Sequence, residues 1–211
     1  MSVKLRTIFK KGLVTGLALQ FAIGPVFFFI TNLVLQRTFW DGFVAVCAVT
    51  LVDYFYITLS ILGIGKILEN KKAKKPLGII SSLVLVLFGL LMLKAIIVNF
   101  DGIQLGTVPS DLISSFTSTF VLTISSPLTI VFFTGIFAAK AMENNFSKKE
   151  LFSFGLGTGF ATLIFMGSAI IFFFVIKTAV PLLLIQFLNA LVGILLVSYG
   201  VFRFVKVLRN N

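Results

Sequence analysis

The sequence predicts an all-α membrane protein with six transmembrane helices, arranged as two inverted three-helix repeats. Three observations predict it: the apolar composition, a series of long apolar runs, and the distribution of lysine and arginine between those runs. Of the 211 residues, 58% are hydrophobic and only 12% are charged, about half the charged fraction of a soluble domain. Several runs exceed the roughly 18 residues that a helix needs to cross the hydrocarbon layer.

The six spans follow one another closely, except for one longer loop. Their expected bounds are residues 13–36, 40–64, 77–98, 112–139, 151–176 and 180–205. The basic N-terminus precedes an apolar run longer than the core of a signal peptide, so we expect a retained first helix. Residues 99–111 contain Gly, Pro and Asp in a turn-rich pattern. We expect a single transmembrane domain over residues 1–211, with repeat one at 1–98 and repeat two at 112–211.

Lysine and arginine predict the orientation of these spans. Four precede the first span, five lie between the second and third, three between the fourth and fifth, and three follow the sixth, which places 15 on one side and three on the other. Positive loops stay inside. We therefore expect a multi-pass protein of the cytoplasmic membrane with both termini in the cytoplasm. The net charge of +11 then favours anionic lipid headgroups as partner, rather than nucleic acid.

Short matching segments relate the two halves of the chain. The first span carries GPVFFF and the fourth carries SPLTIVFF, while SLVLVLFG in the third resembles GILLVSYG in the sixth. Because each half holds an odd number of spans, a duplicated half would enter the membrane upside down relative to the first. Inverted repeats of this kind are typical of secondary transporters.

Two prolines interrupt corresponding spans near their midpoints. Gly24 and Pro25 lie in the middle of the first span, and Ser125, Ser126 and Pro127 lie in the middle of the fourth. Proline removes a backbone N–H and clashes with the carbonyl four residues back. In hydrocarbon the freed groups need a partner or a wet cavity. A single proline favours a simple kink, but a symmetric pair favours two broken helices that build a substrate site at mid-membrane.

One carboxylate lies inside a span. Asp53 occurs in VTLVDYFYI, near the middle of the second span, whereas the other six carboxylates are placed in loops or at interfaces. A carboxylate at that depth costs about 2.5–3.5 kcal/mol and usually marks a proton or substrate path. The alternative is a structural hydrogen-bond anchor between helices.

Two threonines of the fifth span complete the candidate set. Thr158 and Thr162 lie in the small-residue stretch GLGTGFAT, and Thr162 falls near mid-depth. Hydroxyls in membrane helices commonly bond their own backbone or a neighbouring helix, so contact with substrate competes with that structural role. The candidate substrate- or proton-binding residues are Asp53, Gly24, Pro25, Ser125, Ser126, Pro127, Thr158 and Thr162.

The residue inventory excludes several kinds of chemistry. The chain has no histidine and a single cysteine, Cys47. A disulfide within one chain and a thiol relay both need a pair of cysteines. We find no nucleophile–base pair and no metal-ligand cluster, so we expect neither an enzyme nor a bound metal or cofactor.

These residues together resemble the lysine exporter (LysE/RhtB) family of small bacterial amino-acid efflux proteins. IGPV approximates the family's Pro-Gly-Pro element in span one, Asp53 matches its span-two aspartate, and SSPL matches in part its Asn-Pro-Lys element in span four. LNALVGILLVSYG is similar to the family's last span. The chain departs from these motifs at Ile23, Ser126 and Leu128, and replaces the glycines before the aspartate with Ala48, Val49 and Val52.

The expected function is therefore that of a secondary transporter. We expect export of amino acids or related small zwitterions across the cell membrane, coupled to protons by antiport, with a small-molecule substrate and the lipid bilayer as partners. The alternative is an exporter of divalent or heavy-metal cations, for which one carboxylate and one thiol form a poor cage. The glycines at 155, 157 and 159 fit internal packing and a homodimer equally well.

Overall fold

The computed structural model describes residues 3–20, 24–63, 79, 82–91, 93–94, 111–125, 127–179 and 182–209, and those residues form helices without any strand. The elements are α1 (Val3–Gln20), α2 (Pro25–Gln36), α3 (Phe39–Ile61), a shorter helix (Ser82–Leu91), α6 (Leu112–Ile124), α7 (Pro127–Asn144), α8 (Lys148–Ile176), a 3-10 turn (Lys177–Ala179) and α9 (Leu182–Arg209). The predicted loop at 99–111 lies outside the described residues except for Asp111, as does Ser126.

Long apolar helices make this a multi-pass membrane protein. Among the described residues, three helices are long and apolar enough to cross a bilayer: Phe39–Ile61, Lys148–Ile176 and Ala190–Arg209. A fourth span results if the bent pair of α1 and α2 counts as one. The shorter apolar helices Ser82–Leu91 and Leu112–Ile124 lie within the predicted third and fourth spans. The six-span inverted repeat stays a prediction.

Both predicted helix breaks are confirmed. α1 ends at Gln20 and α2 begins at Pro25, with an angle of 81° between the two helices. α6 ends at Ile124 and α7 begins at Pro127. Proline fits the first turn of a helix because the N–H that it lacks would have no partner there. Each proline therefore starts a new helix instead of kinking an old one.

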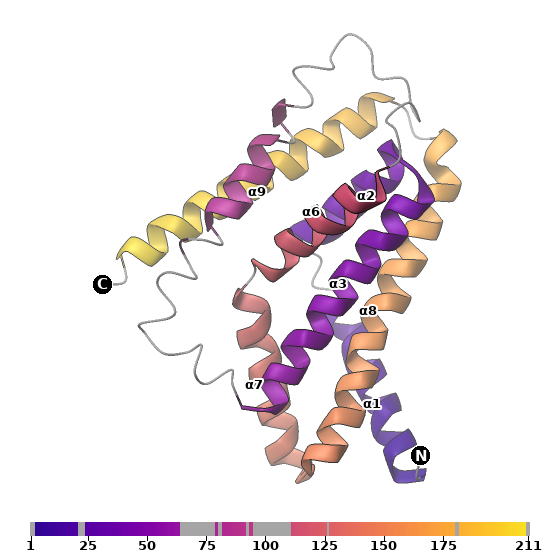
Figure 1. The fold of residues 1–211 in the computed structure, drawn as a ribbon, viewed down its shortest axis with the longest axis vertical. Coiled ribbons are helices and arrows are strands. Elements are labelled where there is room, and N and C mark those ends of the chain that lie inside the picture. The colour runs from indigo at the N-terminus through magenta and orange to yellow at the C-terminus, as the bar shows by residue number, and fades with distance from the viewer. Residues whose placement is uncertain are drawn as a thin grey trace.

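The helix bounds differ from the predicted spans mainly at the ends that carry charge. α1 begins at Val3 instead of residue 13, and α7 continues to Asn144 instead of residue 139. A hydropathy pattern stops where lysines begin, but a helix can continue into the headgroup layer. Figure 1 shows the N-terminus of α1, the end of α7 and the start of α8 at one end of the molecule. The start of α3, the start of α6 and the end of α8 lie at the opposite end.

Glycines let α8 approach its two neighbours closely. A Cβ on Gly157 would overlap the Phe9 carbonyl of α1, and one on Gly12 would overlap the Phe154 carbonyl of α8. Gly155 and Gly159 face α3, where an added Cβ would meet Ile57 and the Tyr54 ring. Small residues at such positions allow backbone-to-backbone packing in membranes. All three glycines of the stretch from 155 to 159 thus serve internal packing.

α2 lies at the centre of the bundle. It packs against α3, α6, α8 and α9. On one side it contributes Ile30 and Val34 to a buried apolar cluster with α3 and α8, and on another it contributes Phe29 to a cluster with α6 and α9. The first break therefore leads directly into the core.

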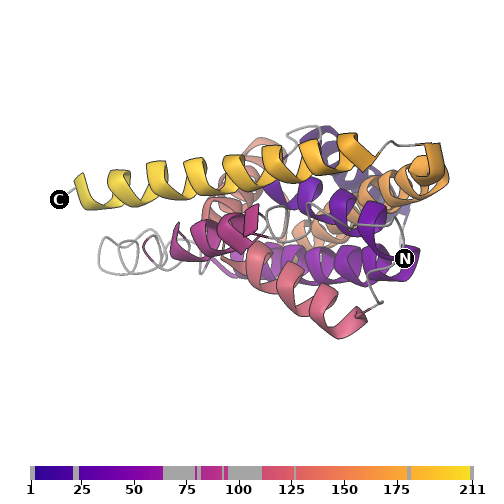
Figure 2. The same ribbon diagram turned by 90° about the horizontal axis from the view of Figure 1, so that it is seen from above.

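The helix Ser82–Leu91 packs on α9 through the small residues that suggested the internal repeat. A Cβ on Gly89 would lie 2.7 Å from the Gly193 carbonyl oxygen, and one on Gly200 would lie 3.0 Å from the Ser82 carbonyl oxygen. The two helices lie side by side in both views (Figures 1 and 2). The small residues Ser82 and Gly89 of this helix thus pack against Gly193 and Gly200 of α9 in one interface.

Candidate functional site

The buried carboxylate of Asp53 is hydrogen-bonded to α8. Asp53 lies on α3 and is 6% exposed. Its Oδ2 accepts a hydrogen bond from Thr162 Oγ1 at 2.7 Å. Thr162 is 1% exposed and is the middle residue of α8 (Lys148–Ile176). The side chain therefore points into the protein and not toward lipid, as a membrane-embedded carboxylate requires.

A second hydrogen bond connects this pair to the first helix break. Gln20, the last residue of α1, donates from Nε2 to Thr162 Oγ1 at 2.7 Å. A threonine hydroxyl has one proton and two lone pairs. Because that proton goes to Asp53, the hydroxyl oxygen accepts from Gln20. The result is a directed chain, Gln20 to Thr162 to Asp53, that joins α1, α8 and α3 beside the break.

Gly24 and Pro25 form the start of α2 at this break. Gly24 is the N-cap residue, with extended backbone at φ −113° and ψ 178°, and its carbonyl accepts from the Phe27 N–H at 3.1 Å. No described atom lies within 4 Å of the place where a Cβ on Gly24 would be. The start of a helix carries unpaired N–H groups and a partial positive charge, which favour an anion. Among the described residues, none fills the space beside this helix start.

The second break is joined to the same turn of α3. Tyr56, three residues after Asp53, donates its hydroxyl to the Ile124 carbonyl oxygen at 2.6 Å. Ile124 ends α6, so its carbonyl lacks the partner that a continuous helix would supply. In hydrocarbon such a group needs a replacement donor. One turn of α3 is thus linked to both breaks. Asp53 reaches the first break through Thr162 and Gln20, and Tyr56 reaches the second through the Ile124 carbonyl.

The other predicted site residues have backbone partners where the structure describes them. Ser125, the C-cap residue of α6, donates from Oγ to the Val121 carbonyl oxygen at 2.6 Å. Thr158 Oγ1 lies 3.0 Å from the Phe154 carbonyl oxygen and 3.2 Å from that of Gly12, so it joins α8 to α1. Substrate contact by either hydroxyl stays a prediction.

Gln20 and Tyr56 are the residues that sequence reasoning missed. Gln20 is a long polar side chain four residues before Gly24 in an apolar run, which places it on the last turn before the break. Tyr56 follows Asp53 by three residues, so the two share a helix face. Both positions can be recognised from nearby residues in the sequence. Many other polar residues in the spans also lie close to a break or to a carboxylate, so these two did not stand out.

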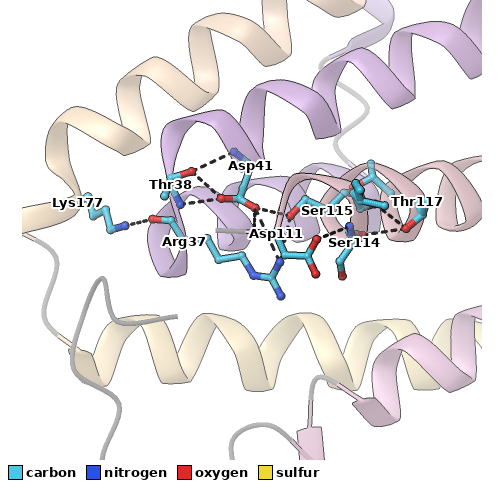
Figure 3. A network of polar contacts seen from close by, with 10 residues as sticks. Arg37, Thr38, Asp41, Asp111, Ser114, Ser115, Thr117 and Lys177 are labelled. Carbon is cyan, nitrogen blue, oxygen red and sulfur yellow. Dashed lines mark hydrogen bonds and ion pairs between the residues drawn. The ribbon is translucent and has the colours of Figure 1, made fainter. Parts of the chain in front are cut away.

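A second buried carboxylate lies in the first turn of α3 (Figure 3). From the sequence, we expect Asp41 in a loop or at the membrane interface, yet the residue is 0% exposed. Its Oδ1 accepts from Ser115 Oγ at 2.7 Å and from the Asp111 backbone N–H at 3.2 Å. Its Oδ2 accepts from Thr38 Oγ1 at 2.6 Å, within a capping box that begins α3. Asp41 therefore joins the start of α3 to the start of α6.

Two cations extend this network to α8. Arg37 Nη1 lies 3.8 Å from Asp41 Oδ1 and donates to Ser115 Oγ at 3.2 Å. Lys177, just after α8, donates to the Arg37 carbonyl. Burial lowers the pKa of Lys177, and the Asp41 charge partly opposes that shift. The network thus connects the α2–α3 corner, α6 and α8 at one end of the molecule.

No metal cage is present in the part of the chain that the structure describes, because no three histidine, cysteine or carboxylate side chains gather there. Cys47 is a free, partly buried thiol on α3. Asp53 accepts from the Thr162 hydroxyl, whose oxygen in turn accepts from the Gln20 amide, and these neighbours are neutral. The site is therefore suited to a proton or an organic cation more than to a divalent ion.

Together, the long apolar helices, the two helix breaks at prolines and the buried carboxylate of Asp53 define a multi-pass membrane protein with a polar site in its interior. A family model for the LysE type translocator matches residues 17–206. The chain belongs to this family, whose members are transporters and not enzymes. No curated protein matches the chain, and no solved structure does.

Proposed function

We propose that the protein is a secondary transporter that exports amino acids or related small zwitterions across the cell membrane, with Asp53 as the proton- or amine-binding group. One observation carries the proposal: a buried carboxylate lies on a hydroxyl–amide chain that reaches a helix break. An ionisable group at this depth is costly in lipid and marks a functional path.

The two ends of a zwitterion have complementary groups here. Asp53 supplies the negative charge for an amine, and the start of α2 at Gly24 and Pro25 supplies a positive helix end for a carboxylate. The second break, with Ser125, Ser126 and Pro127, is the corresponding element of the other half. Half-helices that point at a substrate from two repeats are typical of secondary transporters.

Proton uptake at Asp53 would change the hydrogen-bond chain. The charged carboxylate accepts from Thr162, whereas the protonated acid becomes a donor. Thr162 then accepts from Asp53, and its own proton turns to the carbonyl one helical turn back, as threonines in helices commonly do. The change reaches Gln20 at the first break through the shared hydroxyl oxygen. This coupling supports antiport of protons against substrate.

Six spans and cytoplasmic termini complete the proposed transport cycle. The N-terminal end of the bundle carries most of the positive loops, which favours the cytoplasmic side. The Asp41 network then lies at the outer end, where its contacts between α3, α6 and α8 close the path. Rocking of one half against the other would open it.

An efflux assay in cells loaded with dipeptides tests the proposal. Asp53→Asn should lower export at least about tenfold, because hydrogen bonds to a charged group are worth about 1.5–3 kcal/mol. Glu143→Gln is the matched control, since it removes an exposed carboxylate at 59% exposure and should leave export unchanged. Both variants should reach the membrane in equal amounts.

If the Asp53→Asn variant exported amino acids at the wild-type rate, the proposed role of Asp53 would be contradicted. Efflux of a divalent cation that depends on Asp53, with no amino-acid efflux, would favour the cation alternative instead.

A further inference from the structure

A basic cavity lies at the N-terminal end of the bundle, apart from Asp53 and from both breaks. Its volume is about 480 Å³, within the roughly 300–1,000 Å³ range of small-molecule sites. The walls come from α1, α7 and the residues around the start of α8. They include three lysines, Lys10, Lys11 and Lys140, and three apolar side chains, Val14, Phe146 and Phe154.

One face of α1 forms a wall of the cavity. The lining residues of α1 fall at positions 7, 10, 11, 14 and 15, the three- and four-residue spacing of a single helix face. α7 supplies Lys140 and Asn144, which are also one turn apart. The cavity is therefore a groove between two helices, and Phe154 of α8, at 1% exposure, forms its floor.

The groove has an excess of positive charge. Lys140 pairs with Glu143 at 2.7 Å. Lys10 and Lys11 are exposed and take part in no ion pair or hydrogen bond with the residues that the structure describes. Two unpaired ammonium groups above a concave wall favour an anionic occupant.

The groove also has an apolar side. Val14 is 66% exposed although it lies one turn from Lys10 and Lys11 on the same helix face. Phe146 and Phe154 lie with their rings 6.3 Å apart at the other wall. A soluble anion gains nothing from such surface, whereas a molecule with a charged head and an apolar body covers it. The lining therefore fits an amphiphile.

We propose that this groove binds the phosphate headgroup of an anionic phospholipid, with Lys10 and Lys11 at the phosphate and Val14 beside the glycerol and upper acyl chain. The lysines precede the apolar part of α1, which starts at Leu13, so they lie at the headgroup level of a membrane helix. Basic pockets between membrane helices bind anionic headgroups. The proposal needs the membrane location only and is independent of the transported substrate.

Lipid titration of the full-length purified protein, followed by native mass spectrometry, tests the proposal. Phosphatidylglycerol should bind and phosphatidylcholine should bind at least tenfold more weakly. The double variant Lys10→Gln, Lys11→Gln should weaken phosphatidylglycerol binding about 25-fold, because each lysine near an anionic headgroup contributes about fivefold. The control Lys206→Gln, Arg209→Gln removes two charges at the end of α9 and should change binding less than threefold.

Two further arms separate a built groove from general attraction to charge. Val14→Trp fills the groove without changing charge and should weaken phosphatidylglycerol binding at least fivefold, while the protein remains monodisperse. Equal losses in the Lys10–Lys11 variant and its control, or full binding by Val14→Trp, would overturn the proposal. Competition by glycerol 3-phosphate at the same concentration as the lipid would also overturn it, since the occupant would then be a soluble anion.

Discussion

Among the carboxylates that lie at the start of a helix, Asp41 should be the one whose replacement destabilises the protein most. The side chain is completely buried and accepts hydrogen bonds from Thr38, Ser115 and the Asp111 backbone, with Arg37 at 3.8 Å. Removing one partner of a buried charged network costs about 3–5 kcal/mol, because the remaining groups lose their compensation. We expect Asp41→Ala to lower the free energy of unfolding by that amount.

Asp41→Asn should have a smaller effect. The amide keeps the shape and one acceptor oxygen, but it loses the charge that faces Arg37 and replaces one acceptor by a donor. We expect a loss of about 1.5–3 kcal/mol, the value of a hydrogen bond to a charged group. Asp111→Asn is the matched control: its carboxylate caps α6 through the Ser114 N–H at 2.9 Å, and asparagine caps a helix about as well as aspartate, so this variant should lose little stability.

The single tryptophan gives the readout. Trp40 is next to Asp41 in the chain and is 62% exposed, so its fluorescence reports on the same end of the bundle. Unfolding by SDS in mixed micelles gives the free energy for each variant. A double-mutant cycle with Ser115→Ala isolates the bond between α3 and α6. If Asp41→Ala is no less stable than Asp111→Asn, the buried network does not hold this end together.

Three further predictions concern the breaks and the helix contacts. Tyr56→Phe leaves the carbonyl at the end of α6 without its donor and should cost about 1–3 kcal/mol in the same unfolding assay. Gly157→Ala should cost about 1–3 kcal/mol by overpacking against the α1 backbone, whereas Gly167→Ala, with open space around it, should be neutral or slightly stabilising. Lys4 and Ser147 lower the pKa of Glu150 from 4.5 to about 2, so this carboxylate stabilises the fold above pH 4.5. Its contribution should disappear as the pH falls from 4.5 to 2, and Glu150→Gln should lack that part of the pH dependence.

The sequence predicts the breaks and the burial of Asp53 because both follow from local chemistry. A proline cannot donate to the carbonyl four residues back, whatever surrounds it. A carboxylate inside an apolar span must face protein, because lipid offers no partner. The hydrogen bond between Asp53 and Thr162 of α8 was not predicted, because it depends on the packing of residues that lie 109 positions apart in the chain.

Asp41 shows what local patterns leave out. The capping box of Thr38 and Asp41 can be recognised in the sequence, and it places Asp41 at the first turn of a helix. Burial of the same carboxylate depends on Ser115, which is 74 residues away and on another helix. Hydropathy assigns a charged residue at the end of a span to the interface, and only the packing of α6 against α3 shows that this residue is inside.

The contacts of α3 also indicate which helices move together. Asp41 and Tyr56 are 15 residues apart, so at 100° per residue their side chains differ by only about 60° around the helix axis. Both face α6, which they hold near its start and at its end. Asp53 is turned by about 60° from Tyr56 and faces α8. Because α6 is fixed to α3 at two points, we expect the two helices to move as one body. Any rearrangement at Asp53 then acts between that body and α8, next to the break at Gln20.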